Sequence, residues 1–180
     1  MIKIGLLIWQ GFSVFDYVSI FLLVNHKNKK SMAKIFTRKT INVSDNVYAE
    51  SIKNVCEVFG AVIEPHKCGV QVPNNVDYMV WCPDSNNNEW SNIIDKNRET
   101  IYEYYKNDER KRTKHVNEWI KCPKLKRITF LKENNNGFCF VGIFKINVKK
   151  SQLSNMCVWE LVESSYKLPT NIATNNLYIP

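Results

Sequence analysis

RITFLKENNNGFCFVGIFKI, residues 127–146, contains two apolar runs separated by a short polar segment. The polar segment ends in Asn136-Gly137, residues that tolerate the positive φ of a tight turn, so the pattern predicts a β-hairpin. The second run, residues 138–144, is too continuously apolar to have one wet face and is expected to be buried on both sides. Gly142 within it indicates a bulge or a close backbone approach. Such a hairpin needs further strands around it to be stable.

The rest of the chain offers such strands together with two helices. A helix over residues 14–24, capped by Ser13, has apolar side chains around most of its circumference and is expected to be buried. A shorter helix is expected within 51–59, and the charged run Asn107–Lys114 is expected to be an exposed loop. Extended segments are expected at residues 2–9, 33–37, 76–81, 100–105 and 156–162. The last of these would close the sheet by pairing near the hairpin.

The basic charge of the chain is concentrated in one region. The 180 residues carry a formal charge of +8, with a pI near 9.2 and 44% hydrophobic residues, so a globular domain with a basic surface is expected. Residues 1–95 are neutral overall, whereas residues 96–150 carry about +9. This distribution favours a polyanionic partner bound by the region that ends in the hairpin. A solvated basic face without a partner is the alternative.

The cysteines and the start of the chain indicate a reducing compartment. The six cysteines include no C-x-x-C pair, and no secretory signal precedes them, so reduced thiols are expected. Combining His66 and Cys68 with Cys56 or Cys82 gives no known zinc spacing, so neither a metal nor another cofactor is expected. The apolar start is interrupted by Gln10-Gly11 well short of a membrane span. These features predict a cytoplasmic protein without a membrane partner and leave its oligomeric state open.

Several motifs in the second half of the chain resemble a PUA-like family of modules found in prokaryotic restriction and defence proteins, related in fold to the SRA, EVE and ASCH domains. The matching residues are Asn88-Glu89-Trp90, Ile101, Glu103, Arg127-Ile128-Thr129-Phe130, Lys132, Phe138, Phe140, Gly142 and Phe144. The resemblance spans roughly residues 75–165. It implies a compact β-barrel that reads nucleic acid, in several relatives by holding a single, often modified, base in an aromatic-walled pocket.

The resulting fold class is α+β. We expect a small strand-helix-strand part over residues 1–74, a PUA-like β-barrel over 75–165 and a loosely ordered tail over 166–180. The barrel region interleaves aromatic and basic side chains, a combination that stacks on unstacked bases and neutralises phosphate. We therefore expect a module that recognises a modified base in DNA, rather than in RNA, in a restriction or defence context, with any cleavage made by a partner nuclease.

The expected base pocket centres on Trp90, which follows an Asn-rich loop. If the following residues are extended, Trp90 and Asn92 point to the same face, and an aromatic wall beside an amide can hold one extruded base. Asn88 and Tyr102 complete the expected pocket. For any one aromatic residue, burial in the core is the competing interpretation. The residues expected to bind phosphate are Arg110, Lys111, Arg112, Lys114, Lys126 and Arg127.

The sequence supplies no set of catalytic residues. It has no D…E-x-K spacing for a magnesium ion and no Gly-rich phosphate loop, so no catalytic residue is assigned. Residues Ile4–Asp16 resemble the start of PfpI-type, glutamine-amidotransferase-like domains, in which a cysteine on a nucleophile elbow does the chemistry. No glycine-flanked cysteine of that kind occurs here, and only Asp16 matches a family acidic position. The alternatives are thus a small-molecule-binding or vestigial enzyme domain, or an accessory protein that binds an acidic protein surface.

Overall fold

The computed structural model describes residues 34–62, 69–133, 137–169 and 176–179. By compactness the chain divides into residues 1–33 and residues 34–180, and the description below concerns the second unit alone. The strand expected at 2–9, the helix expected at 14–24 and Asp16 lie outside the described residues. None of the helices in the described ranges combines the length and apolarity that a membrane crossing needs.

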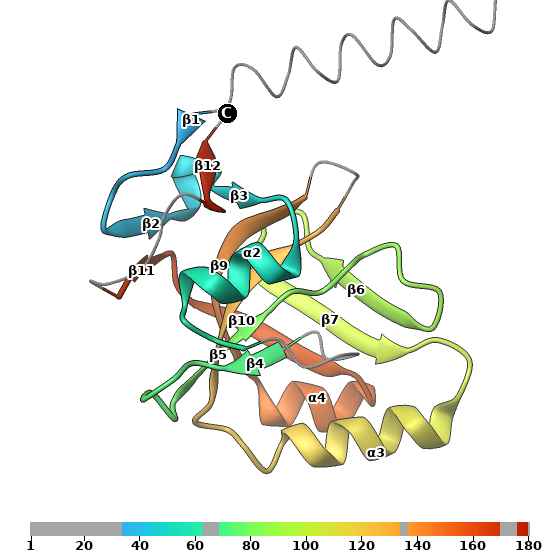
Figure 1. The fold of residues 1–180 in the computed structure, drawn as a ribbon. Helices are drawn as coiled ribbons and strands as arrows, with labels where there is room; N and C mark the ends of the chain where they lie inside the picture. The colour runs from blue at the N-terminus through green and yellow to red at the C-terminus, as the bar shows by residue number, and fades with distance from the viewer. Residues whose placement is uncertain (1–33, 63–68, 134–136, 170–175, 180) are drawn as a thin grey trace, which may run out of the picture. The chain divides into compact units, whose positions relative to one another are not determined.

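The described residues form an α+β structure made mostly of strands (Figure 1). The helical segments are η1 (Val43–Asp45), α2 (Ile52–Val58), α3 (Glu109–Trp119) and α4 (Val148–Ser154). The strands are β1 (Lys34–Ile35), β2 (Thr40–Asn42), β3 (Tyr48–Ala49), β4 (Gly69–Gln71), β5 (Tyr78–Trp81), β6 (Trp90–Ile94), β7 (Thr100–Tyr105), β8 (Lys126–Leu131), β9 (Phe138–Ile146), β10 (Cys157–Glu163), β11 (Ser165–Lys167) and β12 (Tyr178–Ile179).

The expected hairpin is confirmed as β8 and β9, which pair antiparallel with Thr129 opposite Gly142. The register shifts next to this pair, which confirms the predicted bulge. Gly142 has φ +119°, and a Cβ there would lie 2.3 Å from Leu161 Cδ1 on β10. Glycine is therefore required at this point, because a side chain would meet both a strained backbone and a packed neighbour.

The expected closed barrel is not observed, because the sheet is open and branched at β9. One edge of β9 pairs with β8, which continues to β5 and β4. On the other edge, the end of β9 pairs with β10, which continues to β7 and β6. On the same edge, the start of β9 pairs with β3, which continues to β12 and β1. The two branches leave β9 on either side of Gly142. The branch through β10 ends at β6, which within the described sheet pairs with β7 alone. The strand expected at 156–162 is confirmed as β10 beside the hairpin, although it does not close the sheet.

Burial of β9 on both faces is confirmed, because the hairpin separates two hydrophobic clusters. Alternate residues of β8 and β9 enter each cluster, as strand geometry requires. The first cluster includes Ile128, Phe130, Phe140 and Ile143 and is covered by α2. The second includes Leu131, Val141, Phe144 and Ile146 together with Trp81 and Trp159, and Val116 of α3 belongs to it. The candidate functional residues described below lie on the side of the second cluster.

Residues 34–62 and the end of the chain contribute to the first cluster. The expected short helix is present as α2, whose N-cap Ser51 accepts a hydrogen bond from the Asn54 amide. From the tail, Leu168 and Leu177 are buried, β11 pairs with β2, and β12 lies between β1 and β3. The described part of the tail is thus held by strand pairing and by buried leucines.

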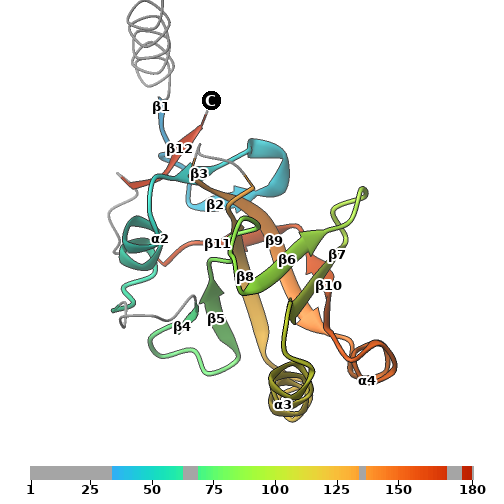
Figure 2. The ribbon, with the colours of Figure 1, turned by 90° about the vertical axis from the view of Figure 1, so that its right-hand side faces the viewer.

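Helix α3 replaces the exposed loop expected at 107–114, so that prediction was wrong. Asp108 is its N-cap, and the carboxylate accepts a hydrogen bond from the Lys111 amide at 3.0 Å. Its inward residues are Val116, His115 and Trp119, a set with few aliphatic side chains to reveal helical periodicity. Figures 1 and 2 show α3 and α4 at the same end of the sheet. The helix carries four basic residues, Arg110, Lys111, Arg112 and Lys114, with Glu109 and Glu118 among them, and lies beside β7.

Candidate nucleic-acid interface

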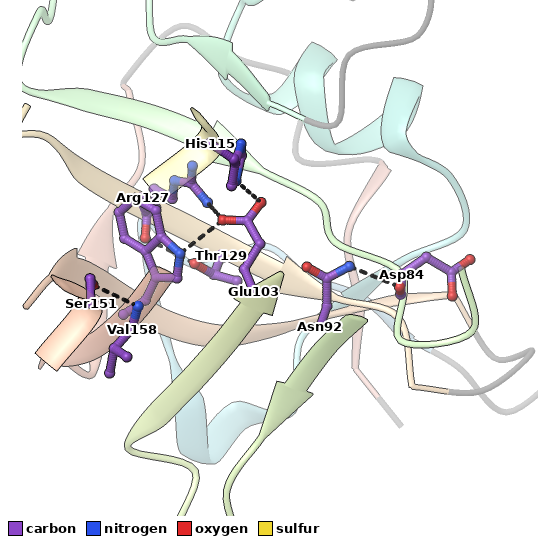
Figure 3. Close-up of polar contacts among 9 residues, drawn as sticks. Asp84, Asn92, Glu103, His115, Arg127, Thr129, Ser151 and Val158 are labelled. Carbon is purple, nitrogen blue, oxygen red and sulfur yellow. Dashed lines mark hydrogen bonds and ion pairs between the residues drawn. The ribbon is translucent and has the colours of Figure 1, made fainter. Parts of the chain in front are cut away.

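A buried carboxylate, Glu103 of β7, organises this side of the molecule (Figure 3). Strand alternation directs Glu103 to the same face as Ile101 and Tyr105, toward α3. Its Oε2 accepts hydrogen bonds from Arg127 Nη1 and Trp159 Nε1, both at 2.9 Å. Its Oε1 lies 3.4 Å from His115 Nε2 of α3. One side chain thus connects β7, β8, β10 and α3.

The environment keeps this carboxylate ionised. Burial by itself raises the pKa of Glu103, but the positive charge of Arg127, the neighbouring His115 side chain and the hydrogen bond from Trp159 outweigh burial and lower the pKa to about 2. A buried carboxylate is stable only when it is paired and hydrogen-bonded, as it is here. Glu103 therefore acts as a fixed negative charge that holds its three partners in place.

Arg127, expected to bind phosphate, is only 1% exposed. Its guanidinium carbon lies 4.3, 4.0 and 3.5 Å from the ring centroids of Trp81, Trp119 and Trp159, respectively. These cation–π contacts and the ion pair with Glu103 commit the guanidinium to the interior. Arg127 points inward, away from any phosphate, because it shares a strand face with the buried Thr129 and Leu131.

Trp90, the centre of the expected base pocket, lies half-buried at the start of the edge strand β6. Its ring centroid lies 5.1 Å from Tyr105 and 4.5 Å from His115, and both rings meet it in tilted or edge-on geometry. The Trp90 amide donates a hydrogen bond to Asn87 Oδ1 at 3.0 Å. The tryptophan is thus held by β7, α3 and its own preceding loop while remaining partly accessible.

The Asn-rich loop is fixed at several points. Lys106 Nζ donates to the Asn87 carbonyl oxygen at 2.7 Å, and Lys132 pairs with Asp84 at 3.0 Å. Asn92 is 6% exposed, and its amide nitrogen donates to the Asp84 carbonyl oxygen at 3.1 Å, so this amide supports the loop (Figure 3). Asn88, two residues before Trp90 in the chain, is exposed.

Tyr102 is separated from the other expected pocket residues. The register pairs it with Ile93 of β6, whereas Asn92 pairs with Glu103. Because neighbouring residues of a strand point to opposite faces, Tyr102 lies on the face away from Trp90 and Asn92. The register therefore places Trp90 and Asn92 on one face of β6 and leaves Tyr102 on the other.

The residues expected to bind phosphate fall into distinct environments. Arg110, Lys111 and Lys114 are exposed along α3. Arg112 is half-buried, and its guanidinium donates to the carbonyl oxygens of Tyr105 and Lys106 at 3.0–3.2 Å. Lys126 lies at the start of β8, where it pairs with Glu163 at 2.6 Å.

Arg112 has a structural role, because its hydrogen bonds connect α3 to the end of β7. Lys126 forms a separate group with Glu163 and Tyr78, and the Glu163 carboxylate and the Tyr78 hydroxyl raise its pKa to about 12. The exposed basic face of α3 is thus the part of this set that is open to a polyanion.

Comparison with known proteins places this architecture in a family. A family model described as the SET and RING associated (SRA) domain matches residues 34–168. The chain belongs to the SRA family. The match begins well before the range 75–165 over which the motifs resemble PUA-like modules, and it includes β1, β2 and β3.

A solved structure supports the same assignment for this SRA domain. The structure titled "The 5-Hydroxymethylcytosine-Specific Restriction Enzyme AbaSI" is similar, with a TM-score of 0.62 and 25% sequence identity. The alignment covers 88% of this chain and 58% of that chain, so the SRA chain spans little more than half the length of the enzyme. No curated protein matches the sequence.

The SRA chain has one group of potential metal ligands among the described residues. Ligand atoms of Glu103, His115 and Cys157 lie within 4.8 Å of one another. However, Arg127 already neutralises the carboxylate, and burial strongly raises the pKa of the Cys157 thiol, which disfavours the thiolate that binds metal. The group therefore fits an ion-pair network better than a cation site.

Sequence reasoning did not identify Glu103, His115, Trp119 and Trp159 as a connected group. Glu103 is part of the motif set that resembles PUA-like modules, but its partners come from residues 12 to 56 positions away along the chain. One signal was present in the sequence. Glu103 and Arg127 each occupy an inward-facing position of a predicted strand, and a charged residue at such a position is expected to need a buried partner of opposite charge.

Proposed function

We propose that this SRA domain binds DNA and reads a modified base, with Trp90 as the stacking wall of the base site. The observation that carries the proposal is the position of a half-buried tryptophan against His115 of a helix with exposed basic residues, where His115 also lies 3.4 Å from Glu103. An aromatic face can stack on a base taken out of the duplex, and neighbouring cations neutralise the flanking phosphates. The family and the similarity to a restriction enzyme support a role in a restriction context.

The base site in this proposal is built around Trp90 and the loop that precedes it. Asn88 is exposed two residues before Trp90 and offers an amide that can both donate to and accept from a base edge. Asn92 supports the loop from inside, and Tyr102 takes no part because it faces the other side of the sheet. The base is proposed to be a modified cytosine, since the similar enzyme is named for 5-hydroxymethylcytosine.

The phosphate-binding surface in this proposal is the outer face of α3. Arg110, Lys111 and Lys114 are exposed there, close in sequence to His115, which contacts Trp90. Arg112 holds the helix in position through the end of β7. Charged side chains of this kind supply affinity independent of sequence, whereas the base contact supplies discrimination.

Cleavage is not part of the function proposed for these residues. The chain covers 58% of the similar restriction enzyme, so the activity of that enzyme does not transfer with the likeness. We propose that the described domain recognises DNA and that a separate nuclease cuts it. Incubating the pure protein with modified DNA and magnesium tests this division, and strand cleavage would contradict it.

The test of the reading function is a set of binding titrations followed by fluorescence anisotropy. The ligands are matched duplexes carrying cytosine, 5-methylcytosine or 5-hydroxymethylcytosine at one position, a single strand and an RNA, each at several salt concentrations. We expect tightest binding to a modified duplex and a salt-dependent component shared by all the DNA ligands. Affinity weaker than about 100 μM for every ligand at low salt would contradict the proposal.

A further inference from the structure

The middle asparagine of the Asn-rich loop is turned toward the protein backbone, whereas its two neighbours are exposed. Asn87 is half-buried between the exposed Asn86 and Asn88. Its side-chain oxygen Oδ1 accepts hydrogen bonds from two successive backbone amides, Glu89 N at 2.9 Å and Trp90 N at 3.0 Å. Asparagine side chains close local turns in this way, so one oxygen atom fixes the backbone at the point where the loop becomes β6.

The main chain of the same loop is attached to the end of β7 through Lys106. Lys106 Nζ donates to the Asn87 carbonyl oxygen at 2.7 Å, and the Lys106 amide donates to the Glu89 carbonyl oxygen at 2.9 Å. The Lys106 carbonyl oxygen in turn accepts a hydrogen bond from Arg112 Nη2 of α3 at 3.2 Å. The backbone immediately before Trp90 is therefore held to β7 and, through Arg112, to the basic helix.

Trp90 needs these attachments because it occupies the first position of β6, which pairs with β7 alone within the described sheet. The end of such a strand opens locally at a small cost in free energy unless further bonds hold its backbone. The indole meets Tyr105 and His115 at centroid distances of 5.1 and 4.5 Å. It keeps both contacts only while the backbone of residue 90 stays in place.

We infer that Asn87 is a positioning residue for base recognition, whose side chain holds the Trp90 backbone so that the indole is oriented before a base arrives. The inference rests on the proposed function, because it takes Trp90 as the stacking wall. Ordering one side chain at the moment of binding raises Kd by a factor of about 2 to 12. A plain duplex bound through its phosphates does not use Trp90, so this cost falls on the modified duplex and lowers base discrimination.

The first test compares base discrimination, the ratio of Kd for a plain duplex to Kd for a modified duplex, among variants of Asn87. Asn87→Ala removes the acceptor of both amides and should lower the ratio by a factor of about 2 to 12. Asn87→Asp retains an oxygen in the position of Oδ1 and should keep the wild-type ratio, although its negative charge weakens binding to every duplex alike. The matched control is Asn97→Ala, the same change at an exposed position in the turn after β6, which should behave as wild type.

Thermal unfolding establishes that each variant is folded. Asn87→Gln, whose longer side chain displaces the oxygen, should lower the ratio in the same way and takes the place of Asn87→Ala if that variant does not fold. A folded Asn87→Ala or Asn87→Gln protein with the wild-type ratio would overturn the inference. An Asn87→Asp protein with a lowered ratio would overturn it as well, because the loss would then belong to the amide nitrogen and to a direct contact with the base.

The second test needs no DNA and separates this inference from the proposed function. The order parameter of the Trp90 indole N–H, assigned by its absence in Trp90→Phe, is measured by NMR relaxation. We expect about 0.85, typical of a rigid group, in wild type and Asn87→Asp, and less than about 0.6 in Asn87→Ala. Equal order parameters in wild type and Asn87→Ala would overturn the positioning role. A wild type that does not discriminate between bases contradicts the proposed function alone, because the order parameter still decides the role of Asn87.

Discussion

At the scale of single residues, the buried pair of Glu103 and Arg127 has the largest expected effect on stability. Removing one member of a buried ion pair leaves the other charge without compensation and typically costs about 3–5 kcal/mol. Glu103→Gln should therefore lower the free energy of unfolding by this amount, because Arg127 remains enclosed by three tryptophans. Urea denaturation measures the change, and a loss below about 1 kcal/mol would contradict the role of the pair.

The same pair predicts how stability depends on pH. The folded-state pKa of Glu103 is lowered from its ordinary 4.5 to about 2, so its contribution is complete above pH 4.5 and is lost as the pH falls toward 2. We expect the wild type to lose on the order of 3 kcal/mol over this range relative to Glu103→Gln. Denaturation curves for both proteins between pH 5 and 2.5 measure the difference. Parallel pH profiles would show that Glu103 has an ordinary pKa.

At the scale of elements, α3 carries basic residues of two kinds: exposed ones such as Arg110, and Arg112, whose guanidinium is hydrogen-bonded to the end of β7. Arg110→Ala removes an exposed charge and should lower the salt dependence of DNA binding by about one unit, with stability almost unchanged. Arg112→Ala should keep the salt dependence but lose about 1–3 kcal/mol of stability, since two carbonyl groups lose a charged donor. Lys53→Ala on α2 removes the same charge elsewhere and should change neither property. An unchanged salt slope in Arg110→Ala would remove α3 from the phosphate-binding surface.

The bulge in β9 gives a second test at this scale. Gly142→Ala should destabilise the domain by more than 1 kcal/mol, because φ is +119° and the new Cβ would lie 2.3 Å from Leu161 Cδ1 and 3.1 Å from the Glu163 carbonyl oxygen. Gly69→Ala is the matched control: its Cβ would meet the end of the flexible Met79 side chain, and its φ is not positive. Equal melting temperatures for the two variants would contradict this account of the bulge.

At the scale of the whole molecule, the sequence predicted what short-range patterns determine. The turn residues and the apolar runs of 127–146 predicted the hairpin, the bulge and the burial of β9 on both faces, and all three are confirmed. The open, branched sheet was not predicted, because the two edges of β9 meet partners from distant parts of the chain. Helix α3 was missed because its inner face carries His115 and Trp119 in place of an aliphatic stripe.

The candidate site was predictable in part for the same reason. Trp90, Asn88 and the exposed cations of α3 are recognisable from local composition, and their use by a base and by phosphates remains a proposal. The inward direction of Arg127 follows from its buried strand neighbours, but its tryptophan enclosure depends on β5, β10 and α3. Long-range pairing of this kind leaves no local pattern in the sequence.

The central claim, that the domain reads a base by stacking it on Trp90, is tested most directly by measuring base discrimination in Trp90→Ala. The ratio of Kd for a plain duplex to Kd for the modified duplex should fall by an amount that corresponds to about 1–3 kcal/mol, with an unchanged salt slope and a folded protein. Trp90→Phe retains an aromatic face and should lose less. A folded Trp90→Ala protein that discriminates as well as the wild type would contradict the account.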